Sequence, residues 1–283
     1  MSDTPKSFAE RFAALRAERG PFCLNLDPTP GLLADWDLKD DIWGLRRFCD
    51  RVIDSADRQL AVIKPQSAYF ERFGAAGFEV LADIIGSIHA LGSLALLDGK
   101  RGDIGSTNSG YADGLLGPDS AMGADGLTVH AYLGFAALGP ILERAQKLGC
   151  GIFPVVLSSN PEGRALQGAR LPGGETVAQG LADEITTHNR SVAGDGVGPV
   201  GAVVGVTAPE APSIVERLPS SLILAPGLGT QGGTFDDVAT RLGSARQRVI
   251  PCAGRSVLSA GPDGDALARA IGEHCEAARK ALT

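Results

Sequence analysis

The sequence lacks long hydrophobic runs and any surplus of positive charge, which removes two large classes of protein from consideration. No apolar stretch approaches the roughly 20 residues that are needed to span a bilayer. The first 20 residues have no apolar signal core and instead predict an amphipathic helix. The formal net charge is −7, whereas binding to a phosphate backbone requires a concentrated positive field. We therefore expect a cytoplasmic protein that has no membrane and no nucleic-acid partner.

Cysteine and histidine are also scarce, with five and four residues respectively. The cysteines are odd in number, widely spaced and without a CxxC pair, namely Cys23, Cys49, Cys150, Cys252 and Cys275. Three of the histidines, His89, His188 and His274, lie in helical patterns and lack the spacing of metal ligands. We expect reduced thiols, and we predict neither a disulfide framework nor a metal site.

What the sequence does contain is a regular alternation of short apolar runs and helical patterns. The expected strands are residues 22–26, 60–64, 93–98, 126–129, 151–157, 200–206, 222–225 and 248–252. The expected helices include residues 41–58, 78–91, 135–148, 176–193, 209–218 and 264–282. Strands that read as continuous apolar runs between helices indicate a parallel sheet covered by helices.

Eight such strand–helix units are the number that closes a TIM barrel. An additional helix precedes them, because Ser7 and Glu10 form a capping-box pattern and Gly20 stands where a helix commonly ends. A doubly wound open sheet is the rival, but no GxGxxG follows the first strand. We predict one α/β domain over residues 1–283, a single (β/α)8 TIM barrel with an additional N-terminal helix.

Charged and polar residues gather where the expected strands end, which is where barrel enzymes carry their active sites. These positions are Asp27, Lys64, Asp98, Lys100, Asp103, His130, Ser159, Gln231, Gly254 and Arg255. The longest irregular stretch, residues 160–175, follows the fifth strand, and a mobile lid and a family insertion are equally consistent with it.

The densest cluster of these residues is LLDGKRGDIGST, residues 96–107. Strand alternation predicts that Asp98 and Lys100 point the same way, about 6.6 Å apart along the strand, with the alternate leucines below them filling the barrel. Lys64 ends the neighbouring strand, whereas Asp103 follows Gly102, beyond the strand, and could reach a neighbouring subunit. A rim salt-bridge network is the structural alternative. However, carboxylates that keep a lysine protonated in a cleft suit it to be a general acid.

The pattern D-x-K-x-x-D-I-x-x-T resembles the signature of the orotidine 5′-monophosphate decarboxylase family. Its residues here are Asp98, Lys100, Asp103, Ile104 and Thr107. Further pieces occur in the family's order, namely LNLD with Asp27, VIKP with Lys64, LSSNP with Ser159, APGLGTQGG with Gln231 and AGRS with Gly254 and Arg255. Chain length and the SSNPEG stretch are similar to the longer bacterial (type 2) subfamily.

The resemblance implies decarboxylation of orotidine 5′-monophosphate to UMP without a cofactor, the last step of de novo UMP synthesis. By similarity, Lys100 stabilises the charge that develops at C6 and donates the proton, while Asp98 orients Lys100. Lys64 and Asp103 would complete an alternating array of charges. In the family the second aspartate, with the Ile104 and Thr107 positions after it, enters from the partner subunit. We therefore expect a homodimer with shared active sites.

The resemblance also implies how substrate is held. Asp27 would bind a ribose hydroxyl, and Ser159, with Ser158 as the alternative, would contact the pyrimidine edge. The loops after strands seven and eight suit a phosphate, because glycines over residues 226–233 leave backbone N–H groups accessible and Gly254 permits close approach. Arg255 supplies a permanently charged fork for phosphate oxygens, and Gln231 could bridge phosphate and ring.

Two other functions remain open from the residues. A sugar-phosphate lyase or decarboxylase on the same barrel would use Mg²⁺ and carry a glutamate at the position of Lys64. A non-catalytic barrel that binds a phosphorylated ligand would have no need of a proton donor. His130 has no clear role in the family, and it and Tyr69 are interpreted as structural or packing residues.

Overall fold

Eight parallel strands form a closed barrel in the computed structural model, which describes residues 5–229 and 232–282. Each strand pairs with the next along the chain, and β1 pairs with β8 to close the ring. The strands are β1 (Cys23–Leu26), β2 (Val62–Pro65), β3 (Leu94–Arg101), β4 (Gly126–Val129), β5 (Gly151–Leu157), β6 (Ala202–Val204), β7 (Ile223–Ala225) and β8 (Val249–Ala253). The predicted (β/α)8 barrel is confirmed.

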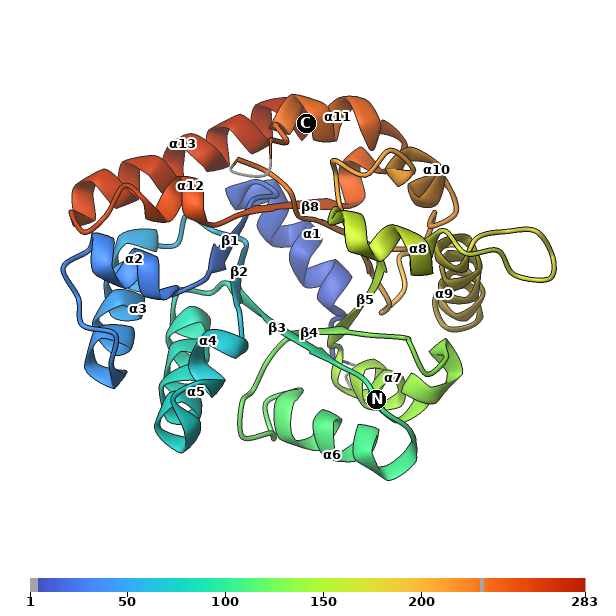
Figure 1. The fold of residues 1–283 in the computed structure, drawn as a ribbon, viewed down its shortest axis with the longest axis horizontal. Helices are drawn as coiled ribbons and strands as arrows, with labels where there is room; N and C mark the ends of the chain where they lie inside the picture. The colour runs from blue at the N-terminus through green and yellow to red at the C-terminus, as the bar shows by residue number, and fades with distance from the viewer. Residues whose placement is uncertain (1–4, 230–231, 283) are drawn as a thin grey trace.

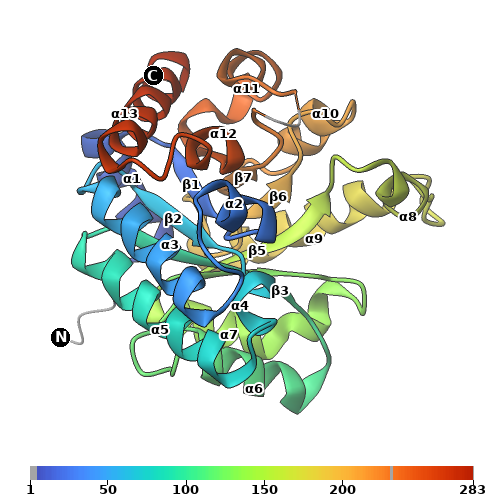
Figure 2. The same cartoon turned by 60° about the vertical axis from the view of Figure 1, so that its left-hand side comes forward.

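Helices surround the ring of strands (Figures 1 and 2). The longer ones are α1 (Phe8–Arg19), α3 (Ile42–Ala56), α5 (Gly74–Ala90), α6 (Gly105–Leu115), α7 (Gly139–Leu148), α9 (Val177–Ala193) and α13 (Gly264–Leu282). The shorter ones are α2 (Pro30–Asp35), α4 (Ala68–Glu71), α8 (Arg164–Gln167), α10 (Ala211–Glu216), α11 (Phe235–Arg241) and α12 (Arg255–Leu258). Within the part of the chain that is described, no helix has the length and apolar character needed to cross a bilayer.

Strand alternation divides the apolar side chains between two packed regions. Leu94 and Leu96 of β3 point into the barrel, where they pack in one cluster with Phe153 of β5. The intervening Ala95 and Leu97 belong to the second cluster, which lies between the strands and the surrounding helices. The prediction that alternate leucines of β3 fill the barrel is thus confirmed, and it explains why polar groups are confined to the strand ends.

Helix α1 closes the N-terminal end of the barrel. Its predicted capping box between Ser7 and Glu10 is present, and Gly20 is its C-cap with a φ of 86°. Phe8 and Phe12 enter the cluster inside the barrel, and the Phe8 ring meets the Phe153 ring edge-on at 5.5 Å.

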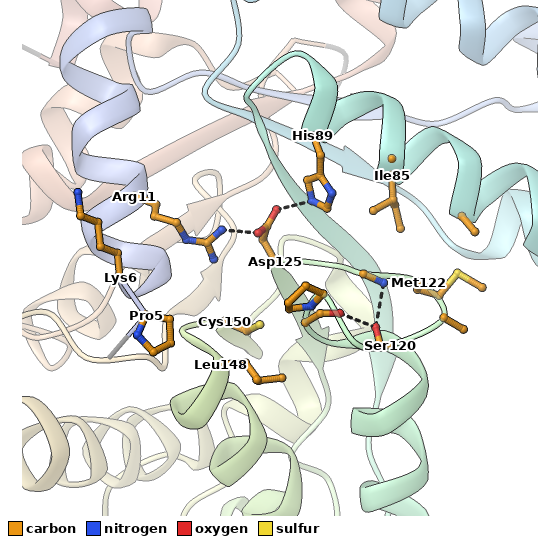
Figure 3. A pocket seen from close by; sticks show the side chains of 16 residues that line it. Pro5, Lys6, Arg11, Ile85, His89, Ser120, Met122, Asp125, Leu148 and Cys150 are labelled. Atoms are coloured by element: carbon orange, nitrogen blue, oxygen red, sulfur yellow. Dashed lines mark hydrogen bonds and ion pairs between the residues drawn. The ribbon is translucent and has the colours of Figure 1, made fainter. Parts of the chain in front are cut away.

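Polar contacts fix α1 in this position. Asp125, which precedes β4, forms an ion pair with Arg11 of α1, and its other carboxylate oxygen lies 2.9 Å from Nε2 of His89 on α5 (Figure 3). Burial raises the pKa of Asp125, but the hydrogen bond with His89 and the charge of Arg11 outweigh burial and hold it below its usual value. Arg16 also donates to the carbonyl of Leu282 on α13 at 2.7 Å. The open pocket of about 610 Å³ beside Arg11 and Asp125 therefore lies at the end of the barrel opposite the strand ends that carry the charged residues (Figure 3).

Candidate active site

Lys64, Asp98 and Lys100 meet at the carboxyl ends of β2 and β3. The ammonium nitrogen of Lys64 lies 2.5 Å from Oδ2 of Asp98, and that of Lys100 lies 2.5 Å from Oδ1. Lys64 and Asp98 are buried, with 5% and 7% of their surfaces exposed, whereas 40% of the Lys100 side chain is exposed. One buried carboxylate thus holds two ammonium groups, one fixed in the interior and one facing solvent.

The electrostatics of this cluster favour full ionisation of the buried pair. Burial alone would raise the pKa of Asp98, but the charges of Lys64 and Lys100 and their hydrogen bonds reverse that effect and hold it well below its usual value. Burial alone would likewise lower the pKa of Lys64, but Asp98 and Asp27 raise it far above its usual value. Both groups are therefore charged at neutral pH.

The backbone that presents Lys100 is not a regular strand. The register between β3 and β4 shifts between Leu97 and Arg101, and Lys100 has a φ of 44°. Asp98 and Lys100 do meet, as predicted. However, the prediction assumed regular strand alternation, and the backbone at Lys100 does not follow it. A lysine in this region costs on the order of 1–3 kcal/mol and persists only where neighbouring contacts fix it.

Two residues at this centre were missed by sequence reasoning. Thr128 of β4 donates from Oγ1 to Oδ1 of Asp98 at 2.7 Å and accepts from the backbone N–H of Lys100 at 3.1 Å. Gln66, just after β2, donates to Oδ2 of Asp98 at 3.2 Å. The signal for Thr128 was in the sequence, since it is the polar residue of an otherwise apolar four-residue strand.

The remaining residues of the D-x-K-x-x-D-I-x-x-T pattern lie apart from this cluster. Oδ1 of Asp103 accepts from the backbone N–H of Ile104 at 2.8 Å, and the backbone N–H of Asp103 donates to Asn108 at 2.9 Å. Among the described residues Asp103 forms no ion pair with either active-site lysine. Ile104 is 61% exposed and Thr107 is exposed at the start of α6. Only three of the four expected charges therefore meet within one chain.

A pocket of about 120 Å³ lies between the ends of β1 and β8 and the loop after β7. Asp27, Tyr69, Gly254 and Arg255 are among the residues that line it, so Tyr69 is more than the packing residue that we expected. Burial raises the pKa of Asp27, and the charges of Lys64, Lys100 and Arg255 partly offset this. Oδ1 of Asp27 is buried and has no hydrogen-bond partner in the described part of the chain. The pocket therefore offers one carboxylate acceptor and one guanidinium.

Gly254 brings β8 close to β1 at this pocket. A Cβ atom at residue 254 would lie 2.9 Å from Cβ of Asn25 and 3.4 Å from Oδ2 of Asp27. Any side chain would thus press on Asn25 of β1 and would contact the carboxylate that lines the pocket, which explains glycine at this position.

The glycine-rich loop after β7 folds back on itself. The backbone N–H of Gly229 donates to the carbonyl of Gly233 at 2.9 Å, and the N–H of Gly233 donates to the carbonyl of Gly227 at 3.0 Å. The N–H of Gly232 donates to the carbonyl of Gly229 at 2.8 Å. The expectation that these N–H groups are accessible is therefore wrong for these three glycines, because the tight turn uses them internally. Gln231 lies outside the described residues.

The structure distinguishes the two serines that follow β5. The backbone N–H of Ser158 donates to Gln167 at 3.0 Å, and its hydroxyl accepts from Nε2 of Gln167 at 2.9 Å. Ser159 instead lies beside Gly205 after β6, where a Cβ would come within 2.8 Å of the Ser159 nitrogen. Ser158 thus serves to hold the irregular segment 160–175, which contains α8 and projects from the barrel (Figure 2).

His130 follows β4, and its pKa is lowered by burial and by the charge of Lys100. All five cysteines are buried, unpaired thiols. Across residues 5–229 and 232–282, no group of three or more His, Cys, Asp or Glu side chains is arranged to hold a metal ion.

Comparisons with known proteins agree on one family. The model of the "Orotidine 5′-phosphate decarboxylase / HUMPS family" matches residues 20–271. Orotidine 5′-phosphate decarboxylase of Myxococcus xanthus is 48% identical over 277 residues, which are 98% of this chain and 96% of the relative. The Salinispora arenicola protein of the same name is 47% identical over 98% of this chain and 99% of its own. The crystal structure of a candidate orotidine 5′-phosphate decarboxylase from Streptomyces avermitilis is 40% identical, with a TM-score of 0.93 over 99% of this chain and 97% of that one.

Proposed function

Because this chain belongs to the orotidine 5′-phosphate decarboxylase / HUMPS family, we propose that it is a carboxy-lyase that converts orotidine 5′-monophosphate to UMP and CO₂. The reaction is a step of pyrimidine biosynthesis. We also propose a cytoplasmic location, since unpaired thiols are typical of a reducing compartment.

The observation that carries this proposal is the binding of both Asp98 oxygens by ammonium groups. Sugar-phosphate enzymes on the same barrel carry a glutamate at the position of Lys64 and use Mg²⁺. Here the ammonium of Lys64 lies against the carboxylate that would otherwise face such a cation. A binding protein would have no use for a second, half-exposed lysine on the same carboxylate. Both alternatives are therefore disfavoured.

The chemistry that we propose begins with cleavage of the bond between C6 of the pyrimidine and its carboxylate. The bonding electrons stay on C6 and CO₂ leaves. Lys100 then donates a proton from Nζ to C6, and the neutral amine regains a proton from solvent. The exposure of Lys100 to solvent suits it to exchange protons, whereas Lys64 is buried and serves as a fixed positive charge. Stabilisation of the C6 charge by preorganised groups would supply much of the barrier lowering.

We propose that the remaining polar groups bind the parts of the substrate that are distant from C6. Asp27 accepts a hydrogen bond from a ribose hydroxyl. This role is supported by its buried Oδ1, which has no hydrogen-bond partner among the described residues. Ser159 contacts the pyrimidine edge, a role that is supported by its place in the LSSNP stretch that this chain shares with the family. Gly254 and Arg255 bind the phosphate with Gln231, and this remote binding energy assembles the site around C6.

We further propose a homodimer in which Asp103, Ile104 and Thr107 complete the active site of the partner. Support comes from the exposure of Ile104 and from two further exposed apolar residues, Tyr132 and Leu133, that follow the neighbouring strand β4. Exposed apolar side chains at neighbouring strand ends are typical of an interface.

A direct assay tests the proposed activity. Purified protein mixed with orotidine 5′-monophosphate is expected to remove the orotate absorbance at the same rate with and without EDTA. A strict requirement for Mg²⁺ would instead favour the sugar-phosphate enzymes. Binding of the nucleotide without turnover would favour a non-catalytic barrel.

Replacement of Arg255 by alanine is expected to raise KM by roughly 10- to 100-fold, because a hydrogen bond between charged groups is lost. The kcat should fall by a smaller factor, because only part of the phosphate binding energy is used to assemble the site around C6. Steady-state kinetics measure both constants, and Arg190→Ala, an exposed arginine on α9, is the matched control. An unchanged KM would refute the phosphate role.

A further inference from the structure

Thr128 is a polar residue in the apolar strand β4, and it is 1% exposed. Its hydroxyl lies where β4 meets the irregular end of β3. We propose that Thr128 is a positioning residue for the reaction, which fixes Lys100 relative to Asp98 so that the ammonium is aimed at C6. This inference rests on the proposed decarboxylase function.

The directions of the two hydrogen bonds of Thr128 follow from the chemistry of its partners. Asp98 is ionised and can only accept, so the single hydroxyl proton of Thr128 goes to Oδ1 at 2.7 Å. The backbone N–H of Lys100 can only donate, so it fills a lone pair of the same hydroxyl at 3.1 Å. Oδ1 of Asp98 also accepts from Nζ of Lys100 at 2.5 Å. The backbone and the side chain of Lys100 are thus tied to one carboxylate oxygen, directly and through Thr128.

This closed ring of contacts explains how the unusual backbone at Lys100 is maintained. The register shift between β3 and β4 removes regular strand pairing at this point. The Thr128 hydroxyl accepts a hydrogen bond from the backbone N–H of Lys100, which would otherwise lack this partner. Because Thr128 is β-branched and buried, its χ1 angle is restricted. The φ of 44° at Lys100, and with it the direction of the ammonium, is therefore supported by the hydroxyl of Thr128 together with Asp98.

The kinetic consequence differs from that of a purely structural hydroxyl. If Thr128 only satisfied a buried N–H, its loss would lower stability and leave chemistry unaffected. If it aims Lys100, its loss displaces the proton donor, and a misplacement of about 1 Å costs roughly 100-fold in rate. Substrate affinity should be preserved, because Asp27 and Arg255 follow other strands, β1 and β8.

Two matched pairs of proteins isolate the hydroxyl. Wild type and Thr128→Val are nearly isosteric, and Thr128→Ser and Thr128→Ala both lack the methyl group. Within each pair we expect loss of the hydroxyl to lower kcat by about 10- to 100-fold. We expect KM and the dissociation constant of UMP to change by less than about threefold. Circular dichroism and the thermal midpoint report folding. If the valine variant does not fold, the serine–alanine pair provides the test.

Equal kcat values within the pairs would overturn the inference, as would a fall in kcat that is matched by loss of UMP binding. These outcomes are distinct from failure of the proposed function. In that case the wild-type protein itself would not decarboxylate orotidine 5′-monophosphate.

Discussion

Replacement of Lys100 by alanine is expected to abolish turnover, with a fall in kcat of about 10⁴-fold or more. Two contributions are lost together, because the ammonium both donates the proton and stabilises the charge at C6. General acid catalysis contributes roughly 10²- to 10⁴-fold, and one preorganised electrostatic contact roughly 10²- to 10³-fold. Loss of orotate absorbance at high enzyme concentration measures the residual rate.

The fold of the Lys100→Ala protein is expected to persist. Asp98 would keep its ion pair with Lys64 and its hydrogen bonds from Gln66 and Thr128, so its buried charge stays compensated. Binding of UMP and the thermal midpoint should confirm an intact pocket. Lys147→Ala, an exposed lysine on α7, is the control for removal of a positive charge. Substantial turnover in Lys100→Ala with normal UMP binding would overturn the assignment of the proton donor.

Mixing two inactive variants is expected to restore activity if active sites are shared. Asp98→Asn and Asp103→Asn should each have little activity alone. A mixed dimer contains one site that carries both substitutions and one site that carries neither. With random exchange of subunits, half of the dimers are mixed and half of their sites are intact, so roughly one quarter of wild-type activity should return. The measurement is turnover before and after dissociation and reassociation of the two proteins.

The matched control for this experiment mixes Asp98→Asn with Lys100→Ala. Asp98 and Lys100 are in contact within one chain. Every site of their mixed dimer therefore lacks one of the two residues, and no activity should return. Absence of recovery with the Asp98 and Asp103 variants, in dimers verified to be mixed, would count against shared sites.

Much of the barrel could be predicted from the sequence because its strands are buried on both faces. The predicted strands 126–129 and 151–157 coincide with β4 and β5, since continuous apolar runs between glycine-rich turns leave little choice of boundary. Strands at the ends of the series shifted by one or two residues. Helix α6 was not among the helical patterns that we singled out, because its sequence, GSTNSGYADGL, has a weak apolar face and three glycines.

The geometry at Lys100 could not be predicted from local sequence. The strand β3 was expected to end at residue 98, yet it continues to Arg101 with a register shift against β4. At that shift the backbone N–H of Lys100 donates to Thr128, which is distant in sequence. Similarly, the internal hydrogen bonds of the glycine-rich loop depend on a three-dimensional turn rather than on glycine content. The sequence thus predicted which residue types lie at the site, whereas their backbone conformations depend on tertiary contacts.

The closure of the barrel floor by α1 has a consequence for synthesis of the protein. Helix α1 is made before all eight strands, but the contact between Arg16 and Leu282 spans 266 residues. Until β8 has left the ribosome, Phe8 and Phe12 lack the complete ring of strands that buries them. Contacts of such long range slow folding. This chain therefore completes its native core only after α13 has been synthesised, and Phe8 and Phe12 stay without their full set of packing partners until β8 is in place.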